Sequence, residues 1–309
     1  MTTLGFDVDV LNTVQFSNHT GYPSWTGTRL TADEVQDLFD GLERNGLTGD
    51  YTHVLTGYIG NYAILEKIQV MVQKLKSKNA RLVYVCDPVM GDDGQLYVAP
   101  EIVPLYRKIL KVADVITPNQ FEAETLSGIQ IDTLASARKV ASALHALGSP
   151  NVIITSMMLP SAEIPTEIQL ATVANDSLYC LTSRLSDNGE SMQHLISFPT
   201  YQGYFTGTGD MFSALVVARL QEAMDNHSPS PLSDAALKVI STVNAVTKKT
   251  WLHQRQYVVI NSHGEADLIE SKPNAPELIR RCELLVVKSK REIENPSLVD
   301  DGVIKIMKL

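Results

Sequence analysis

Cysteine is scarce in the sequence, and the residues that are present stand far apart. The 309 residues include only Cys86, Cys180 and Cys282, with no pair at the close spacing of a zinc site or a disulfide framework. A reducing compartment is therefore the default, and we predict a protein of the cytoplasm, or of the cytoplasm and the nucleus.

Long apolar runs and an excess of positive charge are also missing. No stretch approaches the about 18 consecutive apolar residues of a membrane helix, and no basic segment followed by an apolar one opens the chain. The 26 Lys and Arg residues are outnumbered by 35 Asp and Glu residues, for a formal net charge of -9. Because such a surface repels a phosphate backbone, we expect no nucleic acid and no membrane among the partners. A local amide-lined pocket can still bind a small anion.

The overall composition is that of a globular protein. Hydrophobic residues make up 44% of the chain and charged residues 20%, which excludes collagen-like, coiled-coil and disordered classes. The length fits one large domain or two ordinary ones. Because the sequence has no internal repeat, long linker or low-complexity tract, we predict a single domain over residues 1–309.

Short apolar strands alternate with amphipathic helical patterns in the first half of the chain. A capping box begins at Thr31, and the following apolar residues recur at helical spacing, which predicts a helix over residues 31–45. This alternation predicts an α/β fold, a mainly parallel sheet with helices on both faces. The strands predicted here are residues 52–56, 82–86, 114–116 and 152–155.

The segments before and after this alternation are predicted to have other structures. Phe6, Val8 and Val10 alternate with aspartates, which predicts a half-buried strand over residues 4–14. After residue 155 we predict a hairpin around Asn175-Asp176 and a strand after a polar stretch, together a short antiparallel extension of the sheet. The hairpin segments are residues 168–174 and 178–182, the strand is 195–198, and two further helices are predicted over 209–220 and 234–246.

Polar or Gly/Pro clusters follow four of the predicted strands. In open parallel sheets, ligands bind just beyond the carboxyl ends of the strands, so four clusters in chain order map one edge of a site. Any one cluster alone could be a turn or a helix cap, but four in a row favour a binding site. The clusters are Gly57-Tyr58, Asp87-Pro88 with Gly91-Asp92, Thr117-Pro118-Asn119 with Glu122, and Thr155-Ser156.

A glycine-rich helix entrance lies at Gly207-Thr208-Gly209-Asp210. Glycines let the backbone approach a ligand closely, and the free amides and dipole of a helix start form an anion hole suited to a phosphoryl group. Asp210 could take a proton from an attacking hydroxyl beside that hole. A plain helix N-cap accounts for the same four residues equally well.

Three acidic residues belong to the same predicted edge. Asp87 and Asp92 flank a glycine turn, and Glu122 lies on the next strand-helix element. Mg²⁺ takes one or two carboxylates together with phosphate oxygens and water, so these residues are candidate metal ligands. A solvated acidic turn is the alternative.

Five segments together resemble the pyridoxal kinase family of the ribokinase-like superfamily: Val14–Tyr22, Leu55–Tyr58, Val85–Asp92, Ile116–Glu124 and Phe205–Phe212. The similarity runs from about Leu4 to Pro296 and is weakest over residues 157–200. The resemblance implies a ribokinase-like fold and ATP-dependent phosphorylation of the 5′-hydroxymethyl group of pyridoxal, pyridoxine and pyridoxamine. It also implies Mg²⁺ or Zn²⁺, stimulation by K⁺, and a homodimer.

The resemblance assigns roles to individual residues. Asp210 resembles the catalytic base, and Gly207, Thr208 and Gly209 resemble the anion hole. The vitamin-site residues would be Val14, His19, Thr20 and Tyr58, together with Asp210; the cation and phosphate side would be Asp87, Asp92, Asn119 and Glu122. The ATP contacts would be Thr155, Ser156 and Thr208, with Asp87, Thr117, Thr155 and Phe205 near the monovalent cation and Tyr97 in a closing loop.

The chain departs from the family at its start. Family members have a strand, a serine that contacts the pyridine ring and a Gly-rich turn before the segment that begins here at Leu4. A translation start assigned at an internal Met1, a short isoform and a degenerate homologue each account for this. We expect a chain without that strand to lose ladder hydrogen bonds, to be less stable than an extended form, to retain weak ATP binding and to bind pyridoxal poorly.

Two other functions remain open at this point. A hydroxymethylpyrimidine kinase shares the fold, but such enzymes usually carry cysteine where Asp210 stands. A non-catalytic nucleotide-binding homologue is the second alternative, and the retained Asp210 and anion hole argue against it.

Overall fold

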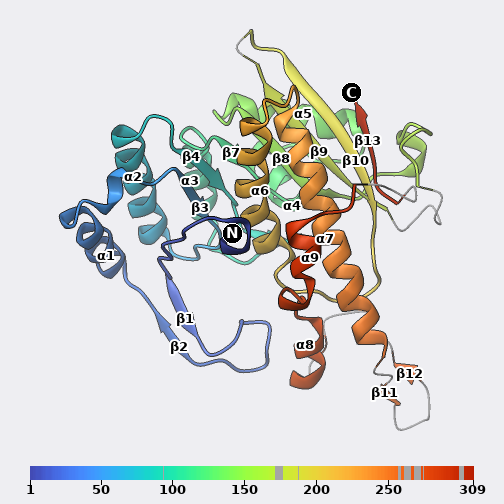
Figure 1. The fold of residues 1–309 in the computed structure, drawn as a ribbon, viewed down its shortest axis with the longest axis horizontal. Coiled ribbons are helices and arrows are strands. Elements are labelled where there is room, and N and C mark those ends of the chain that lie inside the picture. Colours follow the sequence, from blue (N-terminus) through green and yellow to red (C-terminus); the bar gives the residue numbers. More distant parts are fainter. Residues whose placement is uncertain are drawn as a thin grey trace.

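Seven strands form one central sheet in the computed structural model (Figure 1). The structure describes residues 1–309 except 93, 171–176, 187, 257–258, 261–265, 268–272, 274 and 299–302. The strand order is β13-β10-β9-β8-β7-β4-β3. The β3-β4, β4-β7 and β7-β8 pairs are parallel, and the β8-β9, β9-β10 and β10-β13 pairs are antiparallel. The predicted α/β class and antiparallel extension are confirmed.

The strands of the central sheet are short on its parallel side and long on its antiparallel side. They are β3 His53–Thr56, β4 Val83–Cys86, β7 Val115–Ile116, β8 Asn151–Met157, β9 Ser177–Leu185, β10 Ser191–Pro199 and β13 Lys305–Lys308. The small sheets pair β1 Val14–Phe16 with β2 Gly27–Arg29, β5 Gly91–Asp92 with β6 Gln95–Leu96, and β11 Val259–Ile260 with β12 Ala266–Asp267.

The α-helices cover both faces of the central sheet. They are α1 Ala32–Arg44, α2 Tyr62–Lys78, α3 Ile102–Ile109, α4 Gln120–Ser127, α5 Leu134–Ala146, α6 Thr208–Asp225, α7 Pro231–Arg255, α8 Pro276–Cys282 and α9 Lys290–Glu294. The predicted capping box of α1 is present, because Thr31 Oγ1 accepts from the Glu34 N–H and Glu34 Oε2 from the Thr31 N–H.

Side-chain alternation along the strands separates two hydrophobic cores. Tyr84 and Cys86 point to a core built with residues of α1 to α5. Val85, between them, points to the opposite core, built with residues of α6, α7 and α9. Successive side chains of a strand face opposite sides of the sheet, so both faces are buried, as expected for a parallel sheet.

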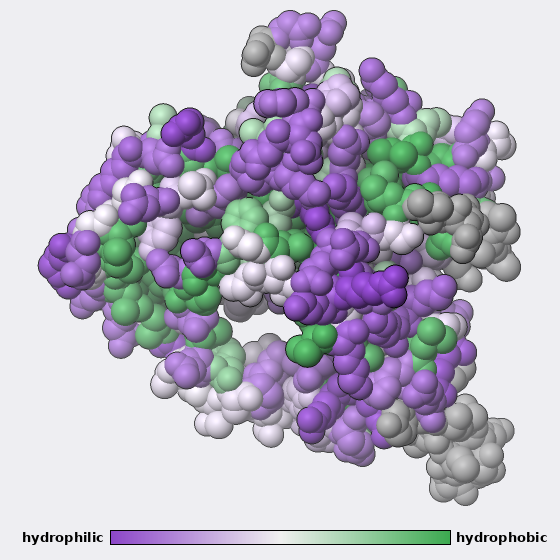
Figure 2. Space-filling view, in the orientation of Figure 1, coloured by the Kyte–Doolittle hydropathy of each residue, from purple (hydrophilic) through white to green (hydrophobic). Residues whose placement is uncertain are grey.

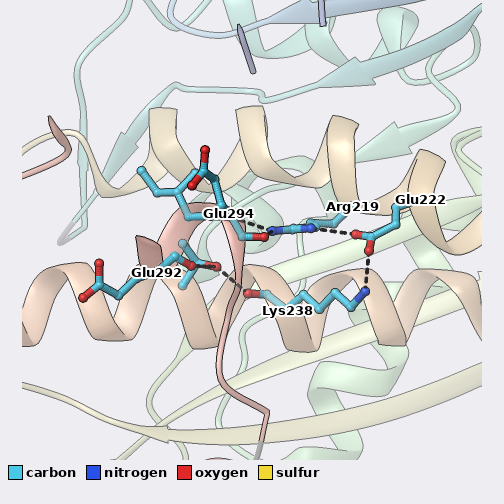
Figure 3. A network of polar contacts seen from close by, with 7 residues as sticks. Arg219, Glu222, Lys238, Glu292 and Glu294 are labelled. Carbon is cyan, nitrogen blue, oxygen red and sulfur yellow. Dashed lines mark hydrogen bonds and ion pairs between the residues drawn. The ribbon is translucent and has the colours of Figure 1, made fainter. Parts of the chain in front are cut away.

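Arg219 ties the C-terminal segment to the second face (Figure 3). Its Nη2 donates to the carbonyl oxygens of Ile293 at 2.6 Å and Glu294 at 3.0 Å. Its Nη1 lies 2.7 Å from Glu222 Oε2, and Lys238 Nζ from α7 donates to Glu222 Oε1 at 2.8 Å. One buried guanidinium therefore joins α6 to α9, with α7 connected through Glu222.

The prediction of a strand over residues 4–14 is wrong. A 3-10 turn spans Thr2–Leu4, and the first strand begins only at Val14. Val8 and Val10 are exposed, whereas Leu4 and Phe6 pack on the second core. The alternation of only three apolar residues did not specify a strand because the structure supplies no ladder partner for this segment.

The hairpin of the extension joins β9 to β10, and between the two strands the Ser186 N–H donates to the Glu190 carbonyl at 2.8 Å. The predicted hairpin of residues 168–174 with 178–182 is wrong, because β9 pairs with β8 on one side and with β10 on the other. Residues 171–176, which include Asn175 and Asp176, lie outside the described part of the chain. The predicted polar stretch from 183 to 193 is wrong, because both strands extend into it. Ser183 and Gln193 are buried there. Gln193 Nε2 donates a hydrogen bond to Ser183 Oγ at 3.2 Å, and His145 Nε2 lies 2.7 Å from the same Ser183 Oγ.

Two further observations concern the whole described chain. The three cysteines are free and buried. No helix among the described residues has the length and apolar content needed to cross a membrane.

Candidate active site

The carboxyl ends of four parallel strands meet at one edge of the sheet, as predicted. The Asp87 N–H, just after β4, donates to the Thr56 carbonyl at the end of β3. The Thr117 N–H, after β7, donates to the Cys86 carbonyl, and the Thr155 N–H donates to the Pro118 carbonyl. The strand-end clusters are therefore neighbours in space.

The start of α6 lies opposite the end of β3. Gly207 is the N-cap, and its φ of 89° lies in the left-handed region that favours glycine. The first amides of a helix have no intrahelical acceptor, so those at Thr208, Gly209 and Asp210 are available to an anion. A Cβ built on Gly57 would lie 3.8 Å from Asp210 Oδ1, so the carboxylate of Asp210 points to the edge of the sheet, where it is exposed.

Asp87 lies behind this entrance and is only 4% exposed. Burial raises the pKa of Asp87 well above its usual range, and the nearby Glu122 and Asp210 carboxylates raise it further. Thr117 is also buried, with its hydroxyl beside the Asp87 carboxyl. Two neighbouring buried carboxyls without a cationic side chain favour either a retained proton or a bound cation.

Glu122 organises the loop that follows β4. Its Oε1 accepts from the Met90 N–H and its Oε2 from the Asn119 N–H, both at 2.9 Å. The Asn119 side chain accepts from the Glu122 N–H and donates to the Gly91 carbonyl. Burial raises the pKa of Glu122 to about 7 despite these hydrogen bonds. The predicted ligand Glu122 thus already has backbone donors on both oxygens.

Asp92 and Tyr97 belong to the small β5-β6 hairpin above this loop. Asp92 pairs with Gln95 and is exposed, and its charge contributes to the raised pKa of Glu122. The Tyr97 N–H donates to the Met90 carbonyl at 2.7 Å, and its side chain is 60% exposed. Tyr97 is therefore placed at the rim, where a closing loop would be.

Thr155 and Ser156 lie on an irregularity of the sheet. The β8-β9 register shifts between Ile154 and Met157, so the two residues between them fall outside the regular ladder. A bulge re-aims side chains next to a site. Both residues are half-buried, as is Thr208 on α6.

The predicted vitamin-site residues are divided between two places. Tyr58 follows β3, next to Gly57, and is 45% exposed. Val14 lies in β1 opposite Arg29, whereas His19 and Thr20 lie at the tip of the arm formed by residues 14–29. This arm leaves the body of the protein, and Figure 2 shows an open gap between the two.

Two residues near the site, Ser213 and Glu283, were not predicted from the sequence. Ser213 is buried one helical turn after Asp210 and lies beside Asp87; its i, i+3 spacing from Asp210 was a usable signal. Glu283 accepts a hydrogen bond from Tyr22 across 261 residues of sequence, a separation for which no local pattern exists.

The described residues contain no group of three or more His, Cys, Asp or Glu side chains arranged to hold a metal. They also contain no Lys or Arg ion pair to Asp87, Glu122 or Asp210. The carboxyls of Asp87, Glu122 and Asp210 therefore lie near one another without an ion-paired Lys or Arg among the described residues.

The sheet order and the glycine-capped helix facing its edge define a ribokinase-like kinase fold. A family model described as phosphomethylpyrimidine kinase matches residues 48–238. Pyridoxal kinase from Bos taurus is 39% identical over 308 residues, covering 97% of this chain and 89% of the relative. That from Arabidopsis thaliana is 40% identical over 273 residues, covering 87% of this chain and 82% of the relative.

A solved structure agrees with these relatives. Pyridoxal kinase from Leishmania donovani, in complex with ADP and pyridoxamine, has a TM-score of 0.79 and 33% identity, covering 100% of this chain and 91% of that one. The chain belongs to the pyridoxal kinase family.

Proposed function

We propose that the protein is an ATP-dependent kinase of vitamin B6, which phosphorylates the 5′-hydroxymethyl group of pyridoxal, pyridoxine and pyridoxamine. The observation that carries this proposal is the carboxylate of Asp210 at the glycine-capped start of α6, facing the end of β3. The relatives support it, since the Leishmania donovani enzyme was solved with ADP and with pyridoxamine or pyridoxine.

We assign the chemical step to the start of α6. Asp210 takes the proton of the 5′-hydroxyl while that oxygen forms a bond to the γ-phosphorus of ATP, and the bond between the γ-phosphorus and the β,γ-bridging oxygen breaks to release ADP. The anion hole at Gly207, Thr208 and Gly209, which includes helix-start amides without an intrahelical acceptor, holds the transferred phosphoryl group, because unpaired N–H groups at a helix start stabilise negative charge.

We assign the remaining predicted residues to two sides of this centre. Asn119, Glu122, Thr155, Ser156 and Thr208 make up the ATP side, along the strand ends. Val14, His19, Thr20 and Tyr58 make up the vitamin side, on the arm and after β3.

We also propose cations for the acidic side. Asp87 is a better candidate than Glu122 for a divalent ion, Mg²⁺ or Zn²⁺, because both Glu122 oxygens already accept backbone N–H groups; Asp92 is the second candidate ligand. Such an ion would neutralise phosphate charge. We assign K⁺ to Asp87, Thr117, Thr155 and Phe205, since the Thr117 hydroxyl lies beside the buried Asp87 carboxyl. Removal of divalent ions by EDTA should abolish turnover, and replacement of K⁺ by Na⁺ should slow it.

Homodimerisation and a cytoplasmic or nuclear location complete the proposal. The first rests on the resemblance to the family, and light scattering of the purified protein tests it. The second rests on the three cysteines, which are free and buried.

The decisive experiment measures the product. The purified chain, incubated with ATP, Mg²⁺ and K⁺, should convert pyridoxal to pyridoxal 5′-phosphate with release of ADP. The Asp210→Asn variant, purified identically, controls for contaminating kinases.

The alternative is a hydroxymethylpyrimidine kinase, which the description of the matching family model favours. Hydroxymethylpyrimidine should therefore be offered in the same assay. Its phosphorylation without turnover of any B6 vitamer would replace our assignment.

A further inference from the structure

The tip of the arm is held by one carboxylate of the C-terminal segment. The Tyr22 hydroxyl donates to Glu283 Oε1 at 2.6 Å, and His19 Nε2 lies 3.7 Å from the same oxygen. The Gly21 N–H donates to His19 Nδ1 at 3.1 Å, so the ring hydrogen of the neutral imidazole lies on Nε2 and faces Glu283. The His19 and Tyr22 rings are 4.7 Å apart. Glu283 therefore meets two side chains of the arm at once.

The same C-terminal segment is bonded to the phosphoryl-transfer loop. The Thr206 N–H, next to Gly207, donates to the Cys282 carbonyl at 3.2 Å, and Thr206 forms an isolated parallel bridge with Glu283. Gln254, near the end of α7, donates to the carbonyls of Tyr204 and Arg281. The backbone at residues 281–283 is thus fixed relative to the entrance of α6.

The arm tip also lies beside the loop before Gly207 itself. A Cβ built on Gly21 would lie 3.7 Å from the Tyr204 hydroxyl. The arm tip therefore lies beside the loop before Gly207 and is hydrogen-bonded to the segment that supports that loop.

We propose that Glu283 is a positioning residue that holds the arm, and with it His19 and Thr20, in register with the Gly207–Asp210 centre. The proposal rests on the proposed function, because it assigns the arm to the vitamin side of the same site. Glu283 touches neither of the proposed substrates; it acts through Tyr22 and His19. Burial and the hydrogen bond to Glu283 raise the pKa of Tyr22 to about 12, so the phenol keeps the proton that it donates.

Steady-state kinetics separate this role from a general loss of folding. Glu283→Ala and Tyr22→Phe should each raise the KM for pyridoxal about fivefold, the size expected for one exposed hydrogen bond to a charged group. The KM for ATP should stay within about twofold, since Thr155, Ser156 and Thr208 lie on other elements. Glu283→Gln keeps an acceptor for Tyr22 and should have a smaller effect.

The double variant and a matched control test the pairing. The double variant Tyr22→Phe/Glu283→Ala should raise the KM for pyridoxal by less than the two single effects combined, because both substitutions remove the same contact. Glu277→Ala removes an exposed carboxylate from the neighbouring α8 and should leave the KM for pyridoxal unchanged.

Fluorescence reports arm position without turnover. The chain has two tryptophans, and Trp25 lies in the arm, 4.3 Å from Phe16 by ring centroids and 38% exposed. In a Trp251→Phe background, Glu283→Ala should increase acrylamide quenching of Trp25, whereas Glu277→Ala should not. A Trp25→Phe protein supplies the blank.

The outcomes distinguish the two proposals. Unchanged Trp25 quenching with an unchanged KM for pyridoxal in Glu283→Ala would overturn the positioning role, and so would fully additive effects of the two substitutions. If the parental protein phosphorylates no B6 vitamer, the proposed function fails, while the quenching result still decides whether Glu283 holds the arm.

Discussion

Glu122 Oε1 accepts a hydrogen bond from the Met90 backbone N–H at 2.9 Å, across 32 residues of sequence. With its other oxygen on the Asn119 N–H, this carboxylate joins the loop after β4 to the start of α4. Both elements carry predicted ATP and cation residues. The position of Glu122 is therefore as important for the shape of the site as for its charge.

Glu122→Gln should destabilise the protein by about 1–3 kcal/mol, the cost of leaving a buried donor unpaired. The amide has one acceptor oxygen, so its NH₂ group would face either the Met90 or the Asn119 N–H. Urea denaturation at pH 7.5 measures the loss. Glu66→Gln, on the exposed side of α2, is the control, and equal stability of Glu122→Gln and Glu66→Gln would contradict the inferred role.

The pKa of Glu122 also predicts a pH dependence. A carboxyl with a folded pKa of about 7 and an ordinary pKa of 4.5 binds more protons in the folded than in the unfolded state between these values. Its contribution to stability is therefore complete below about pH 4.5 and is lost as the pH rises to about 7. The stability difference between the parental protein and Glu122→Gln should shrink over that window, as followed by thermal melts. A constant difference would show that Glu122 does not retain its proton.

Much of this architecture could be read from local patterns, but its long-range contacts could not. The α1 capping box and the strand-end clusters after β3, β4 and β7 are local signals, and the structure places them as predicted. The fourth cluster, Thr155-Ser156, lies within β8 at its register shift. The segment over residues 4–14 had a strand-like alternation that pairing did not support. The polar residues 183–193 did not indicate strands, because the buried Ser183 has its hydrogen-bond partner His145 on a helix 38 positions away in sequence.

His145 supplies a third prediction, again from burial. Its Nδ1 lies 2.8 Å from the Ser149 carbonyl oxygen and Nε2 2.7 Å from Ser183 Oγ. Burial lowers the pKa of His145 below its ordinary 6.5, so the unfolded state binds more protons just below pH 6.5. Stability should therefore fall as the pH drops from 6.5 through the folded pKa.

In His145→Gln, stability should fall less than in the parental protein as the pH drops below 6.5. Its stability at neutral pH should be lower, because one of the two hydrogen bonds of His145 is lost. His227→Asn is the matched control, since His227 is exposed and Asn tolerates its φ of 53°. If His145→Gln and the parental protein lose stability in parallel between pH 6.5 and 5, another group controls this range.

Arg219→Ala should destabilise the protein by about 3 kcal/mol, because it leaves two carbonyls and Glu222 without their shared donor. Arg219→Lys should recover only part of this loss, since an ammonium cannot reproduce the planar fork seen in Figure 3. Arg44→Ala, on the exposed end of α1, is the control. Full rescue by lysine in denaturant melts would show that charge alone, and not the fork, holds α9 to α6.

Asp210→Asn should lower kcat about 100-fold or more, the range for removal of a general base, and should leave nucleotide affinity near the parental value. The substitution preserves the size of the side chain at the start of α6, where Gly57 leaves room for it, so the anion hole should stay intact. Pyridoxal 5′-phosphate formation at saturating substrate gives kcat, and calorimetric titration with ADP gives the affinity. A variant that keeps near-parental kcat would mean that another group accepts the proton. A loss of ADP binding together with kcat would instead place Asp210 in the structure of the helix entrance, with no separate role in catalysis.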